Sequence, residues 1–91
     1  MMTINFYFYN GTGVTATHST GRLDLNNLIA VVCNELKDAT YEGNLSRAVF
    51  RFDDSGDILE IRYWGSFRYF IDCFNVTPEE FLDTLKKLCH Y

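Results

Sequence analysis

Alternating apolar and polar side chains predict that the chain begins with a strand. Residues 3–9 place an apolar side chain at every second position, which is the periodicity of an extended segment with one buried face. Asn10 and Gly11 follow at once, and Asn-Gly between two extended runs is the usual signal of a tight hairpin. The next run, 14–17, is short and weakly apolar, so we expect it at an edge of the sheet.

Two later segments have the spacing of helices instead. Apolar residues recur every three or four positions as far as Leu36, and Asp24 before them is suited to cap the first turn. Near the carboxyl end, Thr77 is suited to the same role, with Pro78 in the first helical position and Glu80 where a capping box requires it. We therefore predict a helix of about 14 residues after Asp24 and a second helix that begins at Pro78.

Three further strands are predicted between the helices, at 47–52, 58–64 and 67–74. The turn-forming sequence DDSGD, residues 53–57, separates the first two, and a glycine-serine pair separates the last two. In the order β-β-α-β-β-β-α, two helices with one apolar stripe each cover one face of an antiparallel sheet of about five strands. This predicts an α+β fold, a single two-layer domain over residues 1–91, since the chain has one proline and no Gly/Ser-rich linker.

Charge and apolar pattern together set the strand pairing that we expect. Placing Arg51 opposite Glu60 joins opposite charges and keeps the apolar residues of both strands on one face. A three-residue loop at 65–67 places Tyr69 beside Tyr63 and keeps the charged residues of the last strand off the apolar face.

Composition and charge narrow the class of protein. Hydrophobic residues make up 47% and aromatic residues 16% of the chain, which is typical of a folded domain. The formal net charge of −4 disfavours general affinity for duplex DNA or anionic membranes. The amino terminus has no basic segment, and Asn5 and Asn10 interrupt its apolar run, so we expect neither a signal peptide nor a membrane span. The expected location is the cytoplasm, which is the host cytoplasm if a virus encodes the chain.

No catalytic, metal or cofactor site is predicted. Cys33, Cys73 and Cys89 form no C-x-x-C pair, and the periodicity turns each of them inward as a reduced core thiol. Residues 53–57 resemble the start of a calcium loop, but the glycine comes too early and Trp64 stands where the bidentate glutamate would be. We therefore expect no enzyme activity, no bound metal and no cofactor.

The sheet face away from the helices carries the residues that we single out for binding. The run RYWGSFRYF, residues 62–70, alternates, so its tyrosines face the helices while its arginines and tryptophan face outward. Together the last three strands place four of the five arginines on this face. The candidate binding residues there are Arg47, Arg51, Glu60, Arg62, Trp64, Arg68 and Phe70. Arginine and tryptophan are enriched at binding hot spots, although ordinary cross-strand pairs on a solvated face give the same pattern.

Acidic residues gather elsewhere in the chain. Asp53, Asp54 and Asp57 lie at the tip of the predicted hairpin, and three more acidic residues lie early in the last helix. Such residues are common in turns and near helix N-termini. The second interpretation is an acidic rim that contacts basic groups of a partner, so these three aspartates are also candidate protein-binding residues.

These features favour a small non-catalytic protein-protein interaction module. The form that we expect is an inhibitor or antidote that binds a host factor or a toxin, by analogy with anti-CRISPR and other anti-defence proteins of phages and mobile elements, or with toxin immunity proteins. The alternative is a single-stranded nucleic-acid-binding domain that stacks bases on Trp64 and Phe70, which the net charge disfavours. A third hypothesis is a homodimer closed by the aromatic sheet face.

Overall fold

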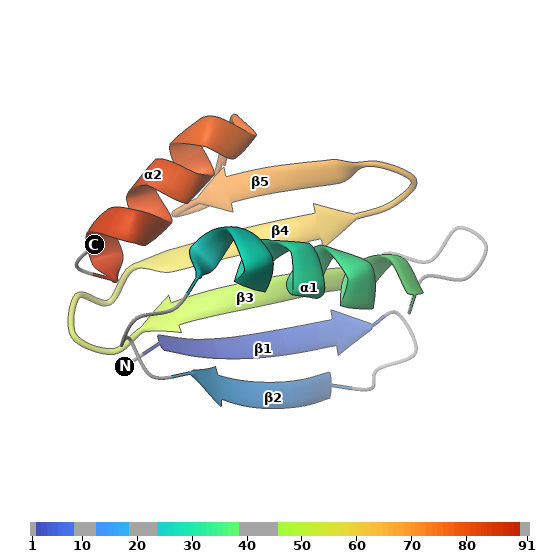
Figure 1. Ribbon diagram of the computed structural model, residues 1–91, viewed down its shortest axis with the longest axis horizontal. Coiled ribbons are helices and arrows are strands. Elements are labelled where there is room, and N and C mark those ends of the chain that lie inside the picture. Colours follow the sequence, from blue (N-terminus) through green and yellow to red (C-terminus); the bar gives the residue numbers. More distant parts are fainter. Residues whose placement is uncertain (1, 9–12, 19–23, 39–45, 90–91) are drawn as a thin grey trace.

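The computed structural model describes residues 2–8, 13–18, 24–38 and 46–89. These residues form one antiparallel six-stranded sheet in the order β2-β1-β3-β4-β5-β6, with both helices on the same face (Figure 1). The strands are β1 (Met2–Phe8), β2 (Gly13–His18), β3 (Ser46–Phe52), β4 (Ile58–Tyr63), β5 (Phe67–Ile71) and β6 (Phe74–Val76), and the helices are α1 (Leu25–Asp38) and α2 (Pro78–Leu88). The predicted α+β class and two-layer arrangement are confirmed.

The hydrophobic core lies between the sheet and the two helices. Phe50 in β3 and Phe81 in α2 are both fully buried, and their rings meet edge to face with centroids 5.6 Å apart. An aromatic pair of this kind contributes about 0.5–1.5 kcal/mol beyond the burial of its surface. The other buried apolar residues are Met2, Ile4, Ala48, Phe52, Leu59 and Ile61 of the sheet, and Leu25, Val32, Leu36, Leu85 and Cys89 of the helices and their ends.

Both predicted helix caps are confirmed. The Asp24 carboxylate accepts a hydrogen bond from the amide of Asn27 at 3.2 Å, which satisfies a backbone donor in the first turn of α1. At α2, the Thr77 hydroxyl oxygen accepts from the amide of Glu80 at 3.1 Å, and Pro78 takes the first helical position. The Glu80 side chain closes the capping box by accepting from the Thr77 hydroxyl at 3.3 Å.

The first hairpin joins the main sheet. Its two strands lie within a residue of their predicted ends, and β2 forms the edge of the sheet as expected. On its other side β1 pairs with β3, so that Thr3 lies opposite Arg51 and Tyr7 lies opposite Arg47. The predicted turn at Asn10-Gly11 lies outside the described residues.

The predicted strand at 67–74 begins at the expected residue but ends early, because the chain turns after Ile71. Asp72 and Cys73 both have positive φ, 47° and 72°, and the short strand β6 follows them, so the sheet has six strands where we expected about five. The Asp72 amide donates to the Ile58 carbonyl at 2.9 Å, and its carboxylate accepts from the Ile58 amide at 3.3 Å. These bonds hold the turn against the start of β4. As a consequence Cys73 is exposed, not turned into the core as predicted.

The predicted register of β3 and β4 is also wrong, by two residues. Arg51 lies opposite Ile58 rather than Glu60, and Glu60 lies opposite Val49. The turn geometry explains the difference. Gly56 has a φ of 75° and its amide donates to the Phe52 carbonyl at 2.8 Å, which closes the hairpin earlier than the charge pairing required.

A similar shift separates β4 and β5 from their predicted pairing. Tyr63 lies opposite Phe67 rather than Tyr69, because the three-residue loop consists of residues 64–66 and not 65–67. Gly65 supplies the positive φ that this loop needs, at 76°. Because both registers differ from the prediction by an even number of residues, the paired side chains of β3, β4 and β5 keep their predicted faces.

Candidate functional site

The sheet face opposite the helices is covered by neither helix, and we call it the open face. Side chains alternate along a strand, so the residues between the core positions point to this face. Its described side chains are Thr3, Asn5 and Tyr7 of β1, Arg47, Val49 and Arg51 of β3, Ile58, Glu60 and Arg62 of β4, Arg68 and Phe70 of β5, and Asn75 of β6, with Trp64 in the loop after β4. The seven residues predicted for the outer face all lie here.

Three arginines form a row across the open face. Arg47 of β3 lies directly opposite Arg62 of β4, which in turn lies opposite Arg68 of β5. Adjacent strands are about 4.8 Å apart, so the three side chains leave the sheet at close spacing. Like charges directly opposite one another on a sheet are destabilising. The row therefore concentrates positive charge at a free-energy cost to the fold.

Glu60 partly neutralises this row. Glu60 precedes Arg62 by two residues on the same face of β4, and its neighbours on the adjacent strands are Val49 and Phe70. Its carboxylate accepts from Arg47 Nη1 at 3.5 Å and from Arg62 Nε. The Glu60 side chain is only 13% exposed, whereas the two arginine side chains are about 40% exposed, at 42% and 41%. One partly buried carboxylate thus holds two guanidiniums, and each guanidinium has further N–H donors.

Aromatic rings contact the same two guanidiniums. Arg47 lies over the ring of Tyr7, 4.9 Å from its centroid, and Arg62 lies over the ring of Phe70 at 4.3 Å. Each contact of this kind contributes about 0.5–1 kcal/mol at an exposed site. Together with Glu60 these residues form a network that crosses β1, β3, β4 and β5.

Arg51 and Arg68 differ from the other two arginines. Both are exposed, and within the described residues neither has an ion pair or a ring contact. Four arginines against one glutamate give the open face a net charge of +3 on a chain whose formal net charge is −4. The charge of the open face is therefore opposite to that of the chain as a whole.

A hollow opens at the end of the arginine row, beside the loop between β4 and β5. It has a volume of about 320 Å³, and its lining residues are Arg62, Trp64, Ser66, Arg68 and Phe70. Trp64 is 67% exposed and is the only tryptophan of the chain. Polar and apolar walls thus meet in one depression of the open face.

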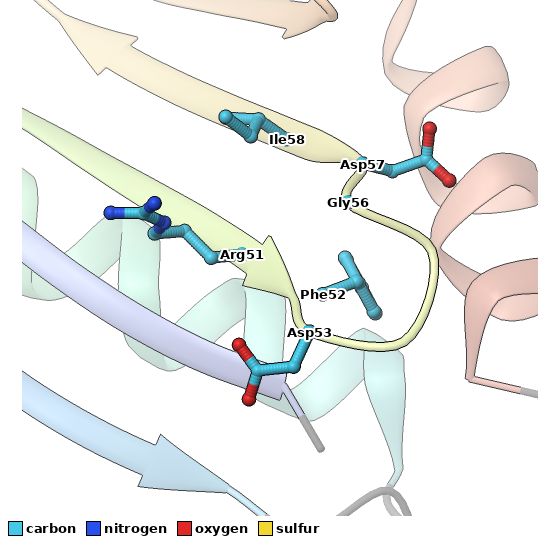
Figure 2. A pocket seen from close by; sticks show the side chains of 6 residues that line it. All are labelled: Arg51, Phe52, Asp53, Gly56, Asp57 and Ile58. Atoms are coloured by element: carbon cyan, nitrogen blue, oxygen red, sulfur yellow. The ribbon is translucent and has the colours of Figure 1, made fainter.

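The acidic hairpin tip forms a separate feature. Asp53 and Asp57 border a smaller hollow of about 210 Å³ at the end of the sheet, close to Arg51 (Figure 2). The two carboxylates point away from each other in this view, and Asp54 lies between them in the chain on the exposed loop. No group of three His, Cys, Asp or Glu side chains arranged to hold a metal ion occurs among residues 2–8, 24–38 and 46–89.

Tyr7 is the main residue of the open face that sequence reasoning missed. Strand alternation showed that it faces away from Ile4, but its contact with Arg47 depends on the pairing of β1 with β3. Ser66 was not singled out for binding, although the predicted loop at 65–67 contained it. The pairing of β1 with β3 has no signal in the local sequence.

Burial affects two of the three thiols, since Cys89 is buried and Cys33 is half-buried. Burial raises the pKa of Cys33, which also forms a hydrogen bond with Tyr69, and burial raises the pKa of Cys89. Thiols of this kind are poor nucleophiles, because the thiolate is the reactive form. Cys33 and Cys89 therefore belong to the packing of the helices against the sheet.

In the part of the chain that the structure describes, no helix combines the length and apolar character needed to cross a membrane. The chain matches no protein-family model, no curated protein and no solved structure.

Proposed function

We propose that this protein is a small non-catalytic interaction module whose open face binds an acidic surface of another protein. The observation that carries the proposal is the row formed by Arg47, Arg62 and Arg68. Three arginines placed directly opposite one another do not stabilise the fold, so their placement is better explained by binding. Carboxylates of a partner would offset the repulsion, and each guanidinium offers planar paired donors for them.

The network around the row supports binding by a preformed surface. Glu60, Tyr7 and Phe70 restrict Arg47 and Arg62 before any partner arrives. Less side-chain entropy is then lost on association, which favours affinity. Arginine and tryptophan are also the residue types that most often dominate the free energy of protein-protein binding.

The same network disfavours the nucleic-acid alternative. Base stacking needs an aromatic ring with a free face, and the Arg62 guanidinium occupies one face of Phe70, 4.3 Å from the ring centroid. Arg47 likewise lies over one face of the Tyr7 ring, although Tyr7 is 39% exposed. Trp64 then remains as an uncovered stacking platform, on a chain whose net negative charge repels a polyanion.

An inhibitor or antidote is the form of interaction module that we propose. A small domain with one charged sheet face is suited to cover a surface that its partner needs for its own activity. Phages and mobile elements use such proteins against host defence factors or toxins, and the proposed site of action is the cytoplasm. The acidic hairpin tip at Asp53, Asp54 and Asp57 would lie at the rim of that contact.

Affinity purification from nuclease-treated lysate tests the proposal. The wild type is compared with Arg68→Glu and Trp64→Ala on the open face, and with Lys86→Glu on the exposed side of α2 as a matched charge reversal. We expect a stoichiometric protein partner with the wild type and Lys86→Glu, and its loss with both open-face variants. Equal recovery by all four proteins, or recovery of nucleic acid alone from untreated lysate, would count against the proposal.

A further inference from the structure

The hollow beside the loop between β4 and β5 places donors from two arginines around one volume. Arg62 and Arg68 lie opposite each other on adjacent strands and both line it. Arg62 uses its Nε for the Glu60 carboxylate, so its two terminal amino groups remain available. Arg68 has no ion-pair partner among the described residues. Two guanidiniums thus converge where a single anionic group can contact both.

The remaining walls of the hollow are mostly apolar and aromatic. Trp64 and Phe70 form them, and the hydroxyl-bearing Ser66 completes the lining. Contact with these rings removes water from a bound group, and charge-assisted hydrogen bonds strengthen when water is excluded. The volume of about 320 Å³ is at the lower end of the range for ligand pockets and accommodates one side chain rather than a larger molecule.

We infer that this hollow receives one aspartate or glutamate side chain of the protein partner, with the carboxylate between Arg62 and Arg68. The inference rests on the proposed function and assigns its central contact. Trp64 packs against the aliphatic part of the inserted residue and shields the charge pair from water. Arg47 and Arg51 lie outside the hollow and contribute long-range attraction only.

Charge argues for this occupant over a second copy of the chain. Two open faces brought together would each carry a net charge of +3, and in a two-fold arrangement like charges approach one another. The rest of the chain is negatively charged, which also disfavours a long polyanion that must pass beyond the open face. A carboxylate on a folded partner needs complementarity only at the contact itself.

Trp64 provides a direct measurement, because it is the only tryptophan of the chain. Tetraglutamate with blocked ends is titrated into the wild type, Arg68→Gln and Arg51→Gln, and tryptophan fluorescence and two-dimensional NMR shifts are recorded. The two variants remove the same charge from the same face, at exposed residues without an ion pair among the described residues. Tetralysine and an oligothymidine of equal charge serve as the other probes.

The expected result is saturable binding of tetraglutamate that Arg68→Gln weakens by about tenfold and Arg51→Gln by less than about twofold. NMR shifts should concentrate at residues 62–70 in the wild type. Equal weakening by both variants, no binding of tetraglutamate, or tighter binding of the oligothymidine would each overturn the assignment of the hollow. Loss of the protein partner in affinity purification with Arg68→Glu would still support the proposed function after any of these, so the two proposals fail separately.

Discussion

The guanidinium of Arg62 lies 4.3 Å from the centroid of the Phe70 ring on the neighbouring strand, while its Nε bonds to the carboxylate of Glu60. One arginine is thus held both by a ring and by a carboxylate, and Glu60 and Phe70 lie opposite each other on the two strands. This arrangement keeps the charge of Arg62 in a fixed position between Arg47 and Arg68. Contacts among residues of the open face therefore hold its arginines in place. Substitutions that remove these contacts should affect stability as well as binding.

Glu60→Gln should destabilise the fold at low ionic strength. The Glu60 carboxylate is the negative charge that contacts the arginine row, and its removal leaves Arg47 and Arg62 facing each other without compensation. Because both arginines are partly solvated, we expect a loss of about 1 kcal/mol in the free energy of unfolding, smaller in high salt. Urea unfolding at two salt concentrations measures it. Glu35→Gln on the exposed side of α1 is the control, and equal losses in both variants would contradict the role of Glu60.

Arg68→Gln should stabilise the fold, in contrast to Glu60→Gln. This change removes one of two like charges that lie directly opposite each other, so the free energy of unfolding should rise by up to about 0.5 kcal/mol in low salt. Arg51→Gln should leave stability unchanged, because its cross-strand neighbours Thr3 and Ile58 carry no charge. Urea unfolding of both variants separates the cases. A stable variant that has lost its partner would show that the row serves binding, whereas a destabilised Arg68→Gln would show that it serves the fold.

Local signals in the sequence were enough to predict the helices and strands and the side of the sheet to which each strand residue points. Asp24 and Thr77 were found as caps from residue type and spacing, because a cap depends only on the first turn of its helix. The strand faces followed from the two-residue period, so the arginines were placed outward correctly. The even size of both register errors preserved that result.

The contacts between strands could not be predicted from local patterns in the sequence. The attraction between Arg51 and Glu60 suggested a pairing that the turn at Gly56 overrides, because two backbone hydrogen bonds close the hairpin first. Asp72 and Cys73 looked like strand residues, and their positive φ depends on bonds to Ile58 fourteen residues earlier in the chain. The pairing of Glu60 with two arginines could be seen only once the register was known.

Thr77→Ala should lower the free energy of unfolding by about 1 kcal/mol. Its hydroxyl satisfies the amide of Glu80 at the start of α2, and that helix carries Phe81 and Leu85 into the core. Thr77→Ser keeps the hydroxyl and should retain most of the stability. Urea unfolding of the two variants makes the comparison. If Thr77→Ser is as destabilised as Thr77→Ala, lost methyl contacts and not the cap explain the effect.

Stability should fall as the pH rises into the alkaline range. Burial raises the pKa of Cys33 and Cys89 above that of an unfolded thiol, and burial likewise raises the pKa of Tyr69. The folded state then keeps protons that the unfolded chain loses, so stability is fully present below about pH 8.5 and decreases as the pH rises through the folded pKa values. Cys33→Ser retains a hydroxyl for Tyr69 and removes one titrating thiol, so urea unfolding between about pH 8 and about pH 10 should show a smaller slope. Cys73→Ser, at an exposed position, is the matched control, and a Cys33→Ser slope equal to that of the control would mean that the Cys33 thiol does not contribute.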